Sequence, residues 1–171
     1  MTEKKTLIIN HRQIKQKARR IAFQILEDNF EEKDIVLVGI ADRGYIFSQR
    51  ILEHLQDIAP DKTISLVKAH IGKTKRKLDG KIDQDHTIAE NKVVIVVDDV
   101  LNSGKTLAYA LGLFINTPLK KMRTAVLVDR CHHTFPIRSD FYGIKLSTTL
   151  KEHVQVCFTE EGFSEDAAWL F

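Results

Sequence analysis

The sequence predicts an α/β fold with a mainly parallel sheet flanked by helices, and three observations support this prediction. Continuous apolar runs rich in β-branched residues occupy residues 35–40, 93–97 and 125–128, as is typical of strands covered on both faces. Segments in which apolar residues recur at helical spacing alternate with these runs. The length of 171 residues suits one domain, which we expect to span residues 1–171.

Helices are expected at residues 11–30, 45–55 and 105–114. Asn10 precedes the first of them and is a residue type that caps helix N-termini. Within this first segment the apolar residues fall mostly three or four positions apart, which places them on one helix face: Ile14, Ala18, Ile21, Ile25 and Leu26.

The rest of the chain is divided between short strands and one long loop. Strands are expected at residues 63–67, 141–144 and 154–158. Residues 68–90 show no periodicity, and a loop of this length in a compact domain is usually functional or mobile. We therefore expect a flexible, basic hood here, whose candidate contacts to phosphate groups are Lys73, Lys75, Arg76 and Lys77.

Composition excludes several classes of protein. With 43% hydrophobic and 29% charged residues of both signs, the chain does not match the signature of intrinsic disorder. It has no apolar run long enough for a membrane helix and no secretory signal, and its two cysteines are too few for a disulfide framework. We therefore expect a cytoplasmic protein with no membrane partner. The 26 basic and 23 acidic residues give a net charge of +3, a weak indication of anionic ligands.

Polar residues follow three of the expected strands, at residues 41–44, 98–99 and 129–130. In open α/β sheets, ligands bind beyond the carboxyl ends of the strands. Asp98 and Asp99 are suited to accept hydrogen bonds from a vicinal diol, or to hold a hydrated divalent cation indirectly. The small-residue turn at 102–106 opens the next helix and is suited to one phosphate group. A diol and a phosphate together describe a ribose 5-phosphate.

Two other interpretations of these motifs fail. Gly104, Lys105 and Thr106 resemble the end of a nucleoside-triphosphate P-loop, but that motif needs a glycine at the position of Asp99. The run of Cys131, His132 and His133 lacks a fourth ligand at a spacing that fits zinc.

The segment 94–107 resembles the phosphoribosyl pyrophosphate (PRPP) binding motif of type I phosphoribosyltransferases: a hydrophobic strand, two acids, two hydrophobic residues and a small-residue turn that closes with threonine. The resemblance implies that Asp98 and Asp99 hold the ribose hydroxyls and that Mg²⁺ bridges these hydroxyls and the pyrophosphate. It further implies that Arg43 clamps the pyrophosphate, so that Arg43, Asp98 and Asp99 are the catalytic candidates. The PRPP-binding set that it implies is Asp42, Arg43, Gly44, Asp98, Asp99, Asn102, Ser103, Gly104, Lys105 and Thr106.

Other segments narrow the resemblance. Residues 38–44 lie where these enzymes carry the pyrophosphate loop. Residues 125–133 and 135–143, with 19–22 in the first helix, are similar to the bifunctional pyrimidine operon attenuator/uracil phosphoribosyltransferase (PyrR) family. The resemblance implies transfer of phosphoribose from PRPP to uracil, giving UMP, and a homodimer or homotetramer. It implies a base-binding set of Arg130, Ile137 and Tyr142, and an RNA-binding face of Arg19, Arg20, His132, His133 and Arg138.

The chain departs from this pattern at positions that bear on function. Asn102 stands where phosphoribosyltransferases for 6-oxopurines usually place a proton-accepting aspartate, which favours uracil over hypoxanthine or guanine. Ala41 and Asp42 replace the usual Lys-Thr, and a carboxylate is unfavourable beside pyrophosphate. Phe23 and Cys131 replace residues of the family's RNA-binding face. Three hypotheses stay open: a uracil phosphoribosyltransferase, a PRPP- and UMP-sensing RNA-binding regulator with weak catalysis, and a purine phosphoribosyltransferase.

Overall fold

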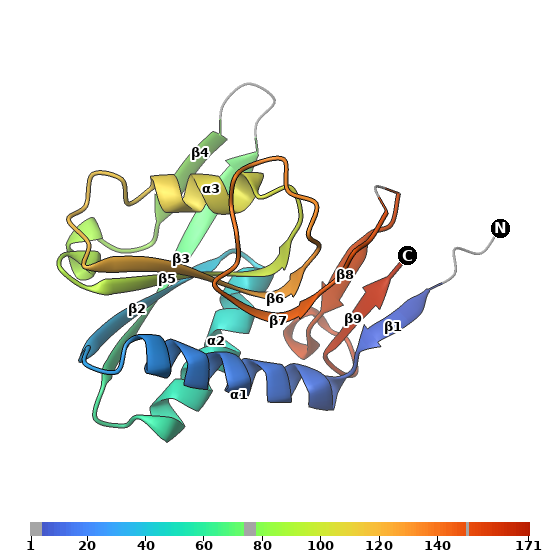
Figure 1. Cartoon of the computed structure of the whole chain (residues 1–171), viewed down its shortest axis with the longest axis horizontal. Helices are drawn as coiled ribbons and strands as arrows, with labels where there is room; N and C mark the ends of the chain where they lie inside the picture. Colours follow the sequence, from blue (N-terminus) through green and yellow to red (C-terminus); the bar gives the residue numbers. More distant parts are fainter. Residues whose placement is uncertain (1–4, 74–77, 150) are drawn as a thin grey trace.

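The computed structural model describes residues 5–73, 78–149 and 151–171, and a six-stranded sheet forms the centre of the fold (Figure 1). The strand order is β4-β3-β2-β5-β6-β7. All neighbours pair in parallel except β4, which runs antiparallel to β3 at one edge. The strands are β2 (Asp34–Ile40), β3 (Thr63–Lys73), β4 (Leu78–Ile82), β5 (Val93–Leu101), β6 (Lys121–Asp129) and β7 (Phe141–Lys145).

Helices cover both faces of this sheet, as the apolar strands predict. The helices α1 (His11–Asp28) and α2 (Arg43–Ile58) pack on one face, and α3 (Lys105–Gly112) packs on the other (Figure 1). Successive side chains of a strand point to opposite faces, so Leu37 belongs to the core under α1 and α2 while Val38 belongs to the core under α3. Full burial of each such side chain contributes about 1.5–3 kcal/mol. The α/β prediction is confirmed.

The first helix begins where the sequence predicts. The side chain of Asn10 accepts a hydrogen bond from the backbone N–H of Gln13 at 2.9 Å, and the Gln13 side chain accepts one from the backbone N–H of Asn10 at 2.9 Å. This reciprocal capping box satisfies two backbone donors that the helix leaves free. The helix ends at Asp28, two residues before the expected limit.

A second, smaller sheet lies beside the large one (Figure 1). It pairs β1 (Thr6–Ile9), β9 (Ala167–Leu170) and β8 (Val154–Cys157) in antiparallel fashion, in the order β1-β9-β8. Arg50 of α2 anchors this part of the chain, since its Nη2 lies 2.7 Å from a carboxylate oxygen of Glu160 and 3.3 Å from one of Asp166. These ion pairs tie the segment between β8 and β9 to the middle of α2.

The expectation of a long unstructured loop over residues 68–90 was wrong. β3 continues to Lys73 and pairs with β4 as a β-hairpin, and a short 3₁₀ helix, η1 (His86–Ala89), follows. The hairpin is held by backbone pairing at the sheet edge, which needs no apolar alternation in the sequence. Of the four basic residues expected to contact phosphate, Lys75, Arg76 and Lys77 lie outside the described residues, as does the side chain of Lys73.

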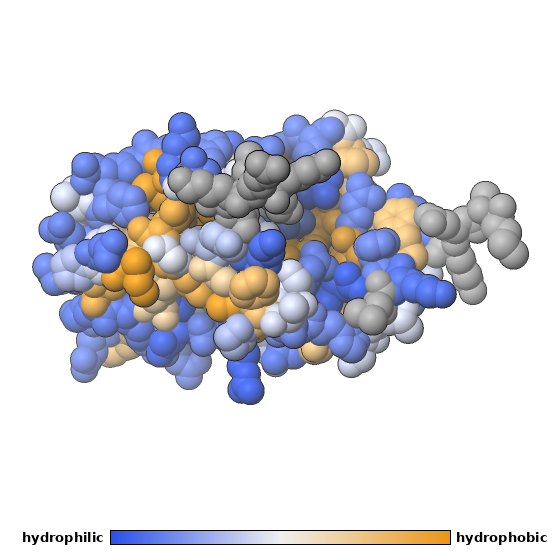
Figure 2. All heavy atoms as spheres, turned by 90° about the horizontal axis from the view of Figure 1, so that it is seen from above, coloured by the Kyte–Doolittle hydropathy of each residue, from blue (hydrophilic) through white to orange (hydrophobic). Residues whose placement is uncertain are grey.

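Figure 2 shows the molecule from above the view of Figure 1, the side that carries α3 and the hairpin, with hydrophobic residues gathered among hydrophilic ones. A mainly apolar groove of about 550 Å³ runs between α3 and β4. Among the described residues, the helices are too short or too polar to cross a membrane.

Candidate active site

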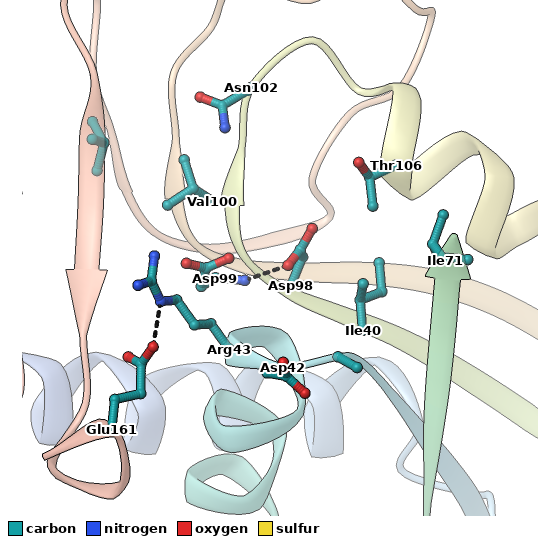
Figure 3. A pocket seen from close by; sticks show the side chains of 12 residues that line it. Ile40, Asp42, Arg43, Ile71, Asp98, Asp99, Val100, Asn102, Thr106 and Glu161 are labelled. Atoms are coloured by element: carbon teal, nitrogen blue, oxygen red, sulfur yellow. Dashed lines mark hydrogen bonds and ion pairs between the residues drawn. The ribbon is translucent and has the colours of Figure 1, made fainter. Parts of the chain in front are cut away.

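A cavity of about 460 Å³ opens at the carboxyl ends of β2 and β5, as expected for a ligand site in an open α/β sheet (Figure 3). Residues that follow β2 and residues at the end of β5 face each other across it, because these two strands are parallel neighbours. Its described lining is Ile40, Ala41, Asp42, Arg43, Ile71, Asp98, Asp99, Val100, Asn102, Thr106, Val154 and Glu161.

The paired carboxylates lie in this cavity, although β5 does not end before them. β5 continues to Leu101, because its backbone pairing with β6 does not depend on side-chain polarity. The Asp98 carboxylate accepts a hydrogen bond from the backbone N–H of Asp99 at 2.9 Å. Burial raises the pKa of the Asp99 carboxyl above its ordinary value. The side-chain hydrogen bond with Asp98 and the charge of Arg43 lower this pKa, but they do not offset the effect of burial. A diol that donates hydrogen bonds would favour the ionised form of this carboxyl.

Gly44 fixes the spacing between the two sides of the cavity. A Cβ atom at this position would lie 2.7 Å from the carbonyl oxygen of Val97 and 2.9 Å from Oδ1 of Asp98. Neither contact leaves room for a side chain, so a glycine is required for α2 to begin this close to β5. The sequence singled out Gly44 through the resemblance, and the structure shows its physical reason.

The small-residue turn after β5 has the geometry of an anion cradle. Gly104 takes a positive φ of 83°, a conformation that favours glycine, and α3 begins at the next residue. The backbone N–H of Lys105 donates to the Ser103 hydroxyl at 3.3 Å. A small hollow of about 40 Å³ adjoins the main cavity here, and Asp98, Asn102, Ser103, Gly104 and Thr106 contribute to its wall.

Arg43 points into the cavity but is already engaged by an acid from the C-terminal segment (Figure 3). Its Nε donates to Oε1 of Glu161 at 2.9 Å, and Glu161 belongs to the short 3₁₀ helix η2 (Thr159–Glu161). Partial burial lowers the pKa of Arg43, but the hydrogen bond and charge of Glu161, with the charge of Asp99, more than offset this and raise it. Sequence reasoning missed Glu161, because nothing in a local pattern signals a partner 118 positions away.

Asp42 lines the cavity but directs its carboxylate mainly to solvent, with 83% of the side chain exposed. Lys68 of β3 lies 3.4 Å from this carboxylate, and its ammonium group stands 5.0 Å from the ring centre of Tyr45. The negative charge that the sequence places in the expected pyrophosphate loop is therefore paired with a cation. Lys68 was also not predicted.

Asp129, at the end of β6, organises the segment that follows it. It is 2% exposed, and its two oxygens accept hydrogen bonds from the Ser139 hydroxyl at 2.6 Å and the backbone N–H of Cys131 at 2.9 Å. His133 Nε2 lies 2.8 Å from Asp129 Oδ1. Burial raises the pKa of Asp129, but these hydrogen bonds and His133 outweigh it and lower the pKa below its ordinary value. In the described part of the chain, no three His, Cys, Asp or Glu residues are grouped to hold a metal ion.

The three residues expected to bind the nucleobase are not among the described residues that line the cavity. Ile137 packs in the core under α3, where its Cβ would lie 3.2 Å from a Cβ added to Gly104. Tyr142 is on the edge strand β7, and its ring stacks under the Lys145 ammonium at 4.4 Å. Arg130 reaches the site only through Asn102, to whose side-chain oxygen it donates at 3.0 Å.

The residues expected on an RNA-binding face are divided between two parts of the fold. Arg20 of α1 donates to the carbonyl oxygens of Tyr142 and Gly143 at 2.9 and 2.6 Å, which is a structural role. Arg19 lies 5.5 Å from the Phe23 ring, while His133 is bound to Asp129. His132 and Arg138 are exposed in the segment after β6. The RNA-binding face stays a prediction.

Comparison with known proteins identifies the fold and the family. The phosphoribosyl transferase domain family matches residues 6–161. The chain belongs to the phosphoribosyltransferase family. It is therefore a pentosyltransferase, as the motif at 94–107 predicts.

Relatives of this phosphoribosyltransferase include the bifunctional protein PyrR of Fusobacterium nucleatum, which is 33% identical over 99% of this chain and 100% of its own length. The bifunctional protein PyrR of Clostridium kluyveri is 35% identical over 91% of this chain and 92% of its own length. The resemblance to the PyrR family is thus confirmed over almost the whole sequence.

Solved structures with the same fold include a hypoxanthine-guanine phosphoribosyltransferase from Bacillus anthracis, with a TM-score of 0.77 and 20% identity over 96% of this chain and 97% of that one. A hypoxanthine phosphoribosyltransferase from Trypanosoma cruzi has a TM-score of 0.79 and 15% identity over 97% of this chain and 91% of its own. At this level of identity, these structures establish the type I phosphoribosyltransferase fold and leave the nucleobase open.

We predict that the Asp129 network makes stability depend on acid pH. Because the pKa of Asp129 is lowered by folding, its contribution is present above about pH 4, the unfolded value, and is lost as pH falls through the folded value. Urea unfolding measured between pH 2.5 and 7 should show a shallower pH dependence for Asp129→Asn than for the unchanged protein, with lower stability at pH 7. The exposed Asp61→Asn variant is the control, and an identical pH dependence in all three proteins would contradict the prediction.

Proposed function

We propose that the protein catalyses Mg²⁺-dependent transfer of phosphoribose from PRPP to uracil, giving UMP and pyrophosphate. The observation that carries this proposal is that two adjacent carboxylates and an arginine line one cavity, and that a helix-opening phosphate cradle adjoins it. These three features match the diol, the 5-phosphate and the pyrophosphate of one substrate. The likeness in sequence to PyrR proteins over nearly the whole chain supports uracil as the acceptor.

The cavity orders the parts of PRPP. Asp98 and Asp99 accept hydrogen bonds from the ribose hydroxyls, and the turn at 102–106 receives the 5-phosphate through backbone N–H groups and hydroxyls. Arg43 lines the side of the cavity next to β2, where the pyrophosphate is expected, and Lys68 lies next to this side through its ion pair with Asp42. Arg43 suits a pyrophosphate because its planar guanidinium can donate two parallel hydrogen bonds to phosphate oxygens.

The reaction is a displacement at the anomeric carbon. The bond between this carbon and the pyrophosphate oxygen breaks, the bond to uracil N1 forms, and the N1 proton leaves to solvent. Charge develops on the ribose ring and on the departing pyrophosphate, so positioning of the reactants and stabilisation of the leaving group supply most of the catalysis. Uracil loses its ring proton readily, which is consistent with an amide, Asn102, instead of a carboxylate in the turn.

The residues of the cavity fit Mg²⁺, which prefers oxygen ligands and keeps several waters. Because the described residues offer no cluster of three acidic or imidazole ligands, the substrate and water would supply most of the ligands, with Asp98 and Asp99 acting through the ribose hydroxyls or water. The ion would neutralise charge on the pyrophosphate.

We predict that the double variant Asp98→Asn/Asp99→Asn abolishes UMP formation, because amides add donors where the ribose hydroxyls need acceptors. The measurement is pyrophosphate release from PRPP and Mg²⁺ with uracil, cytosine, hypoxanthine, guanine or adenine in turn. Uracil should be the preferred acceptor for the unchanged protein and for the control Glu165→Gln. Near-normal turnover by the double variant would contradict the role of the carboxylates, and preference for a purine would contradict uracil as the acceptor.

We also predict that Glu161→Gln lowers the KM for PRPP. Glu161 occupies Arg43 in the free protein and its charge opposes a pyrophosphate, so its neutralisation should favour the substrate. Half-exposed ion pairs contribute about 0.2–1 kcal/mol, which corresponds to a change of up to about fivefold.

The matched control for this substitution is Glu160→Gln. Glu160 is the neighbouring acid but pairs with Arg50 at 2.7 Å, outside the described lining of the cavity. It should leave the KM for PRPP unchanged. Equal effects of the two substitutions, or no effect of Glu161→Gln, would contradict the competition for Arg43.

A further inference from the structure

The connection between β6 and β7 holds the turn that opens α3. The carbonyl oxygen of Ser103 accepts hydrogen bonds from the backbone N–H groups of Thr134 and Phe135, both at 2.9 Å. A Cβ added to Gly104 would lie 3.2 Å from the Cβ of Ile137 and 3.4 Å from that of Phe135. Residues 134–137 therefore pack directly against the turn, although they come from a different part of the chain.

The two hydrogen bonds to Ser103 determine where the N–H of Gly104 points. The peptide between these two residues is trans, so its carbonyl and its N–H point in opposite directions. The hollow of about 40 Å³ beside the main cavity has Ser103 and Gly104 in its described wall, but none of residues 134–137. Because the carbonyl faces the connection, the N–H of Gly104 faces the side of the hollow, where the 5-phosphate is proposed to bind.

Glycine by itself does not select this orientation of the peptide. Gly104 has a φ of 83° and a ψ of −3°, and Ser103 has no positive φ, which together match the central pair of a type II turn. Rotation of the central peptide gives a type I turn, in which the second of these residues has a φ of about −90°. A glycine adopts either sign of φ about equally readily. In the rotated form the Ser103 carbonyl would face the hollow and repel a phosphate, so the donors from the connection favour the binding orientation.

Asp129 anchors the connection on both sides of the residues that contact the turn. Its Oδ1 accepts a hydrogen bond from the backbone N–H of Cys131 at 2.9 Å and lies 2.8 Å from His133 Nε2. An ionised carboxylate only accepts hydrogen bonds, so this histidine nitrogen is the donor. Its Oδ2 accepts from the Ser139 hydroxyl at 2.6 Å. Asp129 is 2% exposed, so water competes little for these hydrogen bonds.

We propose that Asp129 and Ser139 are positioning residues for the 5-phosphate, which hold the Ser103–Gly104 peptide with its N–H toward the phosphate through the β6–β7 connection. This inference rests on the proposed function. Both residues lie outside the described lining of the cavity and of the adjoining hollow, so they act through the backbone of the connection. Loss of either anchor lets the connection move and the peptide rotate, which replaces a donor with a carbonyl.

Titration calorimetry with two ligands tests this assignment. Ser139→Ala should weaken the binding of ribose 5-phosphate at least fivefold, because the rotated peptide no longer donates to the phosphate. The affinity for pyrophosphate with Mg²⁺, which Arg43 is expected to hold, should change less than twofold. The control Ser164→Ala removes an exposed hydroxyl and should change neither affinity. Unchanged affinity for ribose 5-phosphate in Ser139→Ala, or an equal loss for both ligands, would overturn the assignment.

Asp129→Asn provides a second variant for the case in which Ser139→Ala disturbs folding. The amide has one oxygen where the carboxylate uses two, so one of the two anchors is lost while the size of the side chain is kept. The same difference between ribose 5-phosphate and pyrophosphate is expected, and its absence in the folded variant would count against the proposal.

The amide resonance of Gly104 gives a readout that a general loss of stability would not move. The chain has eight glycines, so ¹⁵N-glycine labelling gives few signals, and Gly104→Ala identifies the signal of Gly104. Saturating ribose 5-phosphate should shift this signal downfield in the unchanged protein, because the N–H donates to the phosphate. In Ser139→Ala the shift should fall to less than half, while Gly112, at the other end of α3, stays unshifted in both. A full shift in Ser139→Ala would overturn the proposal.

The two proposals fail in different ways. If the unchanged protein binds neither PRPP nor ribose 5-phosphate, the proposed function is wrong, and the role of Asp129 and Ser139 is wrong with it. If the unchanged protein binds both and makes UMP, but the variants keep their affinity for ribose 5-phosphate and the full shift of Gly104, only the positioning role is wrong.

Discussion

The close approach of Gly44 to Asp98 is the constraint on which the cavity depends. Parallel pairing of β2 with β5 brings the segment after one strand beside the end of the other, and the missing side chain at Gly44 allows the first turn of α2 to lie against Asp98. Arg43 and the two carboxylates are consequently held within one cavity. The fold supplies the juxtaposition through backbone pairing, which leaves the side chains free to bind a ligand.

Most charged groups of the cavity already have partners in the absence of a ligand. Arg43 is engaged by Glu161 and Asp42 by Lys68. A phosphate ligand would therefore replace one set of ion pairs with another. In the free protein, these ion pairs reduce the free-energy cost of partly burying the charged groups of the cavity. The side-chain oxygen of Asn102 is likewise already bound, because it accepts a hydrogen bond from Arg130.

Local patterns predict the elements that depend on local physics. The capping residue Asn10, the doubly covered strands and the turn at 102–106 are all determined by neighbours within a few residues, and the structure agrees with each of them. The strands β1 and β9 were missed because four residues with partial burial carry too little pattern. The hairpin of β3 and β4 was missed because edge pairing relies on backbone bonds.

Partners that are distant in sequence could not be predicted from these patterns. Glu161 reaches Arg43 because η2 follows β8, and β8 belongs to a sheet that the sequence did not reveal. Arg130 was expected at the base from the resemblance, whereas its contacts place it behind Asn102. The sequence thus predicted more of the residues that line the cavity than of the residues that contact and orient them.

The dependence of the cavity on the close approach of Gly44 to Asp98 can be tested by calorimetry, which measures the affinity of Gly44→Ala for PRPP in the presence of Mg²⁺. A Cβ at this position lies within 3 Å of Val97 and Asp98, so the substitution must widen the cavity or displace a carboxylate. We expect the PRPP affinity of Gly44→Ala to be at least tenfold lower, whereas Gly112→Ala, where a Cβ meets nothing within 4 Å, should leave the affinity unchanged. Full PRPP affinity in folded Gly44→Ala would contradict this constraint on the cavity.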